Sequence, residues 1–140
     1  SWSYPPDSPI FRDFAVEVEA NQEEGPDNNQ YGLVLRRDAS GNYYCFPISG
    51  AGNYRFDVNL NGNWREIVPD TWSSKINTGR DKNVLRVVCS GESFIFYANG
   101  AKIGEAQDSS ITSGRVGLVA GSLDDQRLHI SFDNLKVWAL

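Results

Sequence analysis

The chain is short of the residues on which many functions depend. Its 140 residues include no methionine, one histidine and two cysteines, and 13 lysines and arginines are outnumbered by 18 aspartates and glutamates. The net charge of −5 and the pI near 4.8 argue against nucleic acid as a partner, because a phosphate-binding face needs clustered basic side chains. The single histidine, His129, gives little support for a nucleophilic triad or a zinc site, because no second histidine could join it. We expect His129 to be an exposed strand residue.

Long apolar runs are also missing. No run reaches the roughly 20 residues needed to cross a bilayer, so we expect no membrane insertion by this domain. The chain opens with the polar stretch "SWSYPPDSP" and shows no signal peptide, as either an excised domain or a mature secreted chain would. Two cysteines neither require nor exclude an oxidising compartment.

The chain is rich in residues that form strands and turns. Aromatic residues make up 12% of it and glycines number 13, and apolar residues alternate with polar ones in nearly every segment. Asn-Gly pairs at 61–62 and 99–100 separate such segments and suit two-residue hairpin turns, in which both residues have positive φ. We therefore predict one all-β domain over residues 1–140, an antiparallel two-sheet β-sandwich of the jelly-roll type. The predicted core consists of Phe14, Val16, Phe46, Phe56, Leu85, Val87, Phe94, Phe96, Leu118, Ile130 and Phe132.

The stretch "NYRFDVNLNGNWREIV", residues 53–68, predicts a hairpin whose register follows from its turn. A two-residue Asn-Gly turn pairs each residue before it with one after it. The predicted pairs are Leu60 with Asn63, Asn59 with Trp64, and Phe56 with Ile67. Trp64 then lies on the face opposite the core, because side chains alternate strictly along a strand.

That outer face carries aromatic and polar side chains that folding alone does not require. A sandwich needs one apolar face per sheet, and aromatic rings bordered by planar polar groups match a sugar, which has an apolar C–H face and hydroxyls. An alternative stays open, in which Trp64 is half-buried under a neighbouring loop and Tyr43 is merely a good strand former. The predicted ligand-binding residues are Tyr43, Arg55, Asp57, Asn59 and Trp64, with Trp72 from the following segment.

Several blocks of the sequence resemble a known family. "DFAVEVEA", "YGLVLRRDASGNYYCFPISGAGNYRF", "NVLRVVCSGESFIFYANGAKIGEA", "SGRVGLVAGS" and "FDNLKVW" are similar to the laminin-G-like branch of the concanavalin A-like lectin/glucanase superfamily, in particular its bacterial extracellular domains. The resemblance implies a β-sandwich in an extracellular or cell-surface protein. Such domains usually have one or two strands before the position of "WSYPP", which implies that N-terminal strands of a longer chain are missing or arranged differently.

Catalysis and metal binding have weaker support. The related laminarinase-type glucanases carry Glu-x-Asp-x-x-Glu on one strand, and this sequence lacks that motif. The nearest pair, Glu17 and Glu19, is predicted to form a solvated outer face. We expect no cofactor, and calcium stays open as an alternative, because acidic loops offer oxygen donors without diagnostic spacing. These donors are Asp27, Asn28, Asp124 and Asp125.

Three functions remain open from the sequence. The first is a non-catalytic, lectin-like domain that binds carbohydrate or glycoprotein. The second is a structural or adhesive protein-interaction module, and the third is a glycoside-processing enzyme with an unfamiliar site. Exposed aromatic side chains would favour the first, a flat polar face the second, and two close carboxyls in a pocket the third.

The two cysteines are predicted to stay unpaired. Cys89 has the parity of Leu85 and Val87 and should lie in the core beside Phe94, whereas Cys45 should face away from the core. A disulfide needs Cβ atoms about 3.5–4.5 Å apart with their bonds directed at one another, which opposite faces do not provide. A single stabilising disulfide is the alternative.

Overall fold

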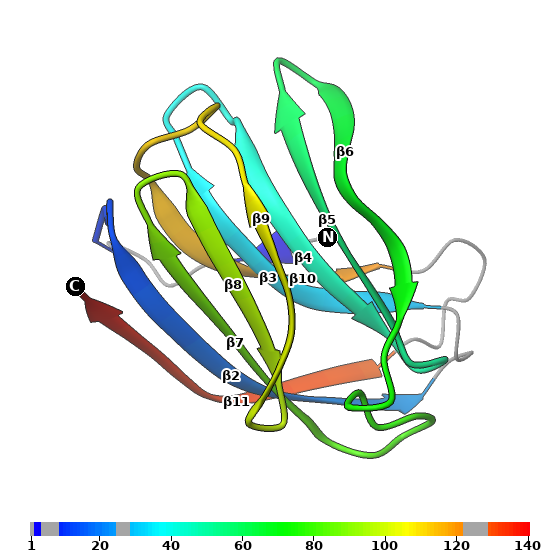
Figure 1. Cartoon of the computed structure of the whole chain (residues 1–140). Coiled ribbons are helices and arrows are strands. Elements are labelled where there is room, and N and C mark those ends of the chain that lie inside the picture. Colours follow the sequence, from blue (N-terminus) through cyan, green and yellow to red (C-terminus); the bar gives the residue numbers. More distant parts are fainter. Residues whose placement is uncertain (1, 4–8, 25–28, 122–128) are drawn as a thin grey trace.

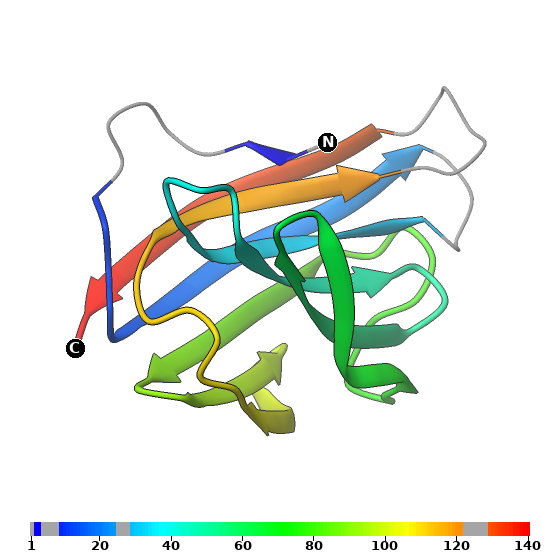
Figure 2. The ribbon, with the colours of Figure 1, turned by 90° about the horizontal axis from the view of Figure 1, so that it is seen from above.

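Eleven strands and no helix make up the described part of the chain. The computed structural model describes residues 2–3, 9–24, 29–121 and 129–140, and at 2–3, 24 and 129–131 it describes the backbone alone. One sheet has the order β1-β10-β3-β4-β5-β6 and the other β11-β2-β7-β8-β9, with antiparallel pairing throughout. Figure 1 labels the strands of both sheets, and Figure 2 shows the same strands from above. The predicted fold class is confirmed.

The eleven strands divide six and five between the two sheets. The strands of the six-stranded sheet are β1 (Trp2–Ser3), β3 (Gln30–Arg37), β4 (Tyr43–Ser49), β5 (Asn53–Leu60), β6 (Asn63–Trp72) and β10 (Arg115–Gly121). Those of the five-stranded sheet are β2 (Phe14–Glu24), β7 (Asn83–Ser90), β8 (Ser93–Ala98), β9 (Ala101–Gln107) and β11 (His129–Ala139).

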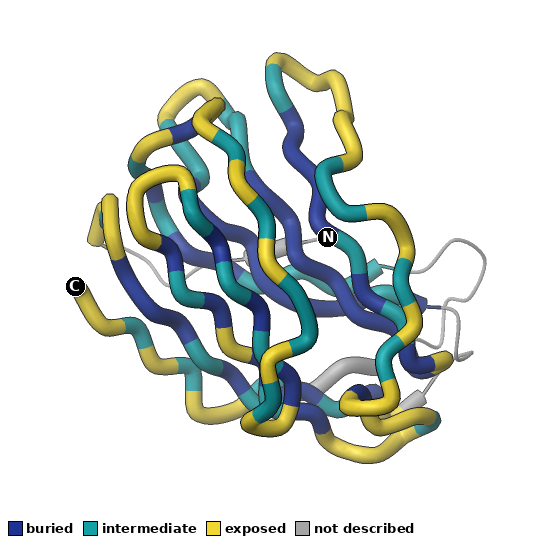
Figure 3. The backbone as a smooth tube through the Cα atoms, in the orientation of Figure 1, coloured by how far each residue is buried: buried dark blue, intermediate teal, exposed yellow. Residues whose placement is uncertain are grey.

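The core fills the space between the two sheets. Buried and partly exposed residues alternate along β7 and β8, as Figure 3 shows, because every second side chain points inward. Of the predicted core, Leu118 and Phe132 are only partly buried, and the side chain of Ile130 lies outside the described residues. The fully buried members are Phe14, Val16, Phe46, Phe56, Leu85, Val87, Phe94 and Phe96.

The predicted turns are confirmed by their backbone angles. Asn61 and Gly62 have φ values of 55° and 83°, and Asn99 and Gly100 have 53° and 84°, as a hairpin turn of two positive-φ residues requires. Both Asn-Gly pairs connect neighbouring strands, β5 with β6 and β8 with β9.

The hairpin of β5 and β6 differs from the prediction beyond its first pairs. Leu60 pairs with Asn63 and Asn59 with Trp64, as predicted, but Phe56 pairs with Val68 instead of Ile67. The prediction for Phe56 is wrong because the register shifts on both sides of this residue. Each shift is a bulge, in which β6 has one more residue than β5.

The predicted faces of both cysteines are confirmed. Cys89 is fully buried in the core and pairs with Phe94, whereas Cys45 pairs with Asp57 on the outer side of the six-stranded sheet. Both thiols are free.

Candidate functional site

The candidate site lies on the outer face of β4, β5 and β6, away from the five-stranded sheet. Tyr43 pairs with Asn59 and Asn59 with Trp64, so these three residues form one row across the strands. The side chain of Val58, next to Asn59, is fully buried in the core, which places the row on the opposite face.

The two aromatic residues of this row contact each other. The ring centroids of Tyr43 and Trp64 are 5.5 Å apart with an interplanar angle of 90°, the edge-to-face arrangement that aromatic pairs prefer. Trp64 nevertheless remains 56% exposed. The indole packs against Tyr43 of β4 and also faces solvent.

Polar groups border the aromatic pair. Burial raises the pKa of Tyr43 above its usual value, although the guanidinium of Arg37 and a hydrogen bond with Asn59 oppose this rise. The phenol therefore stays protonated near neutral pH and can both donate and accept a hydrogen bond. Asn59 is only 9% exposed, and its side-chain oxygen also accepts a bond from the Gly62 amide at 3.1 Å, which fixes the amide plane.

Arg55 and Asp57 form an ion pair in the next part of the same face. Arg55 Nε lies 2.5 Å from Asp57 Oδ2, and the side chains are 34% and 9% exposed. Asp57 also lies opposite Glu66 on β6. Burial, together with the nearby Asp57 carboxylate, raises the pKa of the Cys45 thiol to about 12, so this neighbour stays protonated.

Trp72 is separated from the other predicted residues. It lies at the far end of β6, opposite Asn53, and is 64% exposed. Asn53 in turn donates a hydrogen bond of 2.6 Å from Nδ2 to Asp70 Oδ2. Asn53, Glu66 and Asp70 are not among the residues predicted from the sequence, although Asn53 shares the strand parity of Arg55 and could have been predicted from it.

Comparison with solved structures shows what the chain is similar to. Carbohydrate binding module CBM66 from Bacillus subtilis has a TM-score of 0.77 at 22% identity, over 93% of this chain and 77% of that one. Sheep galectin-11 has a TM-score of 0.65 at 12% identity, over 96% of this chain and 100% of that one. The chain has a lectin-like β-sandwich fold.

A domain of a larger protein has a similar fold. The GH43 BlXynB protein from Bacillus licheniformis has a TM-score of 0.66 at 16% identity, over 92% of this chain but only 28% of that one. No protein-family profile matches the sequence, and no curated protein sequence matches it.

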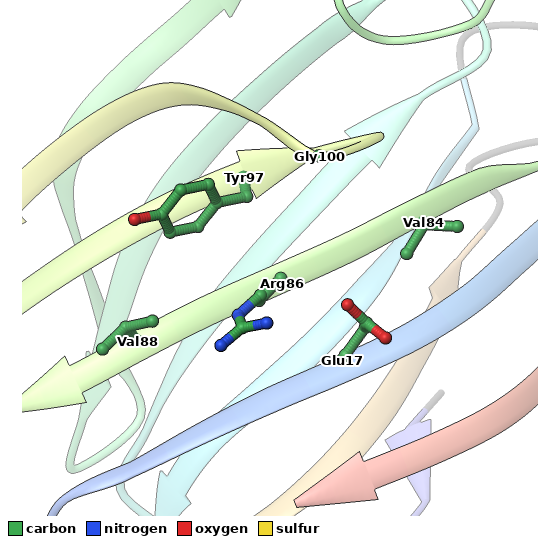
Figure 4. A pocket seen from close by; sticks show the side chains of 6 residues that line it. All are labelled: Glu17, Val84, Arg86, Val88, Tyr97 and Gly100. Atoms are coloured by element: carbon green, nitrogen blue, oxygen red, sulfur yellow. The ribbon is translucent and has the colours of Figure 1, made fainter.

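The five-stranded sheet carries a separate hollow on its outer face. Figure 4 shows Arg86 on β7 between Tyr97 on β8 and Glu17 on β2. Glu17 is the one carboxyl among the lining residues, whereas a retaining glycosidase needs two about 5 Å apart. The neighbouring Glu19 forms an ion pair of 3.7 Å with Lys82. The hollow therefore lacks the paired carboxyls that a retaining glycosidase requires.

Other sequence expectations concern metals and membranes. In residues 9–23, 29–121 and 132–140, the side chains form no group of three or more His, Cys, Asp or Glu that could hold a metal ion. The calcium candidates Asp27, Asn28, Asp124 and Asp125 lie outside the described residues, as does the side chain of His129. Within the described chain, no helix has the length and apolar character to cross a bilayer.

Proposed function

We propose that this chain is a non-catalytic carbohydrate-binding domain and that its glycan binds on the outer face of β4, β5 and β6. The observation that carries the proposal is Trp64, whose indole is 56% exposed yet held edge-to-face by Tyr43. An indole oriented in this way offers a flat apolar surface to the C–H face of a sugar. Asn59 and the Arg55–Asp57 pair lie beside it and provide planar partners for the hydroxyls.

The loss of glycan affinity expected from removing Trp64 follows from the exposed area of its ring. One face of an indole contributes on the order of 100 Å², and burying this area under a sugar stabilises the complex by about 2.5 kcal/mol. Replacing Trp64 by alanine should therefore weaken binding about 50-fold, because every 1.4 kcal/mol corresponds to a factor of ten.

The test is a glycan-array and polysaccharide-retardation screen of the wild type, Trp64→Ala and Trp138→Ala. Trp138 is a matched control, because it is 43% exposed but lies on β11 of the other sheet. There the guanidinium carbon of Arg86 lies 5.5 Å from the centre of the Trp138 ring. We expect Trp64→Ala to lose affinity and Trp138→Ala to retain it, with circular dichroism unchanged in both.

Two results would contradict glycan binding at this face. One is a wild type that binds no glycan, and the other is a Trp64→Ala variant that binds as tightly as the wild type. Release of reducing sugar from a bound glycan would contradict the non-catalytic part of the proposal and favour the alternative of a glycoside-processing enzyme. Repeating the screen with EDTA tests the expectation that binding needs no calcium.

The wider assignment rests on the same proposal. The sequence blocks that resemble the laminin-G-like branch support placing the domain in an extracellular or cell-surface protein, where a carbohydrate or glycoprotein would be its partner. The name of the similar structure CBM66, a carbohydrate binding module, also supports carbohydrate as the ligand.

A further inference from the structure

We infer that the site extends along β5 from Trp64 to Trp72 and takes a neutral glycan chain of about four sugar units. This inference rests on the proposed function and deepens it, because it names the kind and length of the glycan. The features that carry it are the spacing of the two tryptophans, the polar pairs between them and the charge of that face.

The two tryptophans lie on one face at opposite ends of the same strand. Trp64 is opposite Asn59 and Trp72 is opposite Asn53, and paired residues of antiparallel strands share a face. From Asn53 to Asn59 the chain advances six residues, which corresponds to about 20 Å. With covalent bonds near 1.5 Å, an extended sugar unit spans about 5 Å, so roughly four units fit between the indoles.

The bulges in β6 preserve this arrangement. Between Trp64 and Trp72 the strand advances eight residues while β5 advances six, so β6 accommodates two extra residues, one on each side of Phe56. A single extra residue would have turned one indole to the core face, because side chains alternate along a strand. Two extra residues keep both indoles on the outer face.

Polar pairs occupy the space between the tryptophans. Asn53 donates to Asp70 at 2.6 Å, and Arg55 Nε lies 2.5 Å from Asp57 Oδ2. Each pair holds its own planar groups in place, so binding hydroxyls there costs little additional side-chain entropy. A chain of sugars running along β5 would pass both pairs in succession.

The charge of this face excludes anionic glycans. The three carboxylates of Asp57, Glu66 and Asp70 outnumber two guanidiniums, that of Arg55, which pairs with Asp57, and that of Arg37, which lies over the Tyr43 ring. Uronic acids or sulfated sugars would be repelled here, because like charges at short range are unfavourable even in water. A neutral chain meets no such penalty.

Trp72 also lies against the turn before β5, but most of the surface of its indole remains exposed. A Cβ built on Gly52 would lie 3.2 Å from the indole Nε1 of Trp72. The indole is still 64% exposed, more than Trp64, and so most of its surface remains available to a ligand.

The test is a length series of a neutral oligosaccharide, from one to about six units, taken from the glycan that the screen identifies. Isothermal titration would compare the wild type with Trp64→Ala, Trp72→Ala and the control Trp138→Ala. We expect wild-type affinity to rise with length up to about four units and then level off. Trp72→Ala should lose at least about tenfold on the tetramer and less than about twofold on the monomer and dimer. Trp64→Ala should lose affinity at every length.

The outcomes separate this inference from the proposed function. Affinity that does not rise beyond the dimer, or a Trp72→Ala loss that is absent or equal at all lengths, would overturn the extended site while the glycan site at Trp64 stands. Tighter binding of a uronate-containing chain of the same length would overturn the neutral class. A wild type that binds no glycan would overturn the proposed function itself. Trp72→Phe, which keeps a smaller ring, should recover part of the tetramer affinity and serves as the second variant.

Discussion

Replacing Asp108 by asparagine should destabilise the protein in a pH-dependent way. The carboxylate lies just after β9, is only 8% exposed, and accepts hydrogen bonds from Tyr44 Oη and Arg65 Nη2 at 2.7 Å and from the Ser110 amide at 2.9 Å. Arg65 is the neighbour of Trp64 but pairs with the buried Val58, so it lies on the opposite face from the indole. Asp108 therefore anchors the hairpin that carries the candidate site.

The expected loss of folding stability follows from the pKa of the Asp108 carboxyl. Burial raises the pKa of Asp108, but the hydrogen bonds from Ser110, Tyr44 and Arg65 outweigh burial and lower the pKa from its ordinary 3.8 to about 2. A shift of almost two units corresponds to about 2.5 kcal/mol of stabilisation by the ionised form. Because the folded-state pKa is the lower one, this stabilisation is complete above about pH 5 and is lost as the pH falls from about 4 to 2.

Urea unfolding followed by far-UV circular dichroism between pH 7 and pH 2 measures this effect. Fluorescence is a poorer probe, because Trp64, Trp72 and Trp138 are already exposed in the folded protein. We expect Asp108→Asn to be about 2–3 kcal/mol less stable than the wild type at pH 7, with the difference vanishing near pH 2.

Two further variants test whether the loss of stability comes from the hydrogen-bonded carboxylate of Asp108. Glu105→Gln removes an exposed carboxylate that lies 3.2 Å from Lys102, and should cost less than about 1 kcal/mol at any pH. Arg65→Ala removes one donor to Asp108 and should show a smaller loss with the same pH dependence. A cost for Asp108→Asn below about 1 kcal/mol at pH 7, or one that does not shrink toward pH 2, would refute the reasoning.

Two other predictions concern the core and the thiols. Phe96→Ala should cost about 3–5 kcal/mol, because the buried ring lies 4.8 Å from two neighbouring phenylalanine rings. Tyr97→Ala, on the outer face of the same strand, should cost under about 1 kcal/mol, and an equal loss in both variants would contradict the core assignment. Burial raises the pKa of both Cys45 and Cys89 to about 12, so a thiol reagent should label the native protein slowly. After denaturation without reductant it should label two thiols per chain; labelling of none would show a disulfide.

Local features of the fold follow from the amino-acid sequence alone. Alternation of apolar residues predicts which side chains enter the core, and eight of the predicted members are fully buried. The Asn61-Gly62 turn determines the nearest pairs, and with them the face of Trp64, because a two-residue turn leaves no freedom of register close to it. The faces of Cys45 and Cys89 follow from the same parity.

Features that depend on contacts between strands distant in the sequence arise only in the folded sandwich. The bulges beside Phe56 change the pairing of β6 and set the distance between Trp64 and Trp72. Pro69 lies in one of them, as proline in an edge strand often does, but the pairing with β5 decides where each bulge falls. Arg36 is an equally clear case. Its backbone has a φ of 51°, and the guanidinium is buried, where it donates to the carbonyl oxygens of Arg12 and Ile111. A charged side chain in a strand normally faces solvent, because burial removes its hydration. The guanidinium of Arg36 can be buried because carbonyl oxygens from distant segments accept its hydrogen bonds, and the folded sandwich brings these segments together.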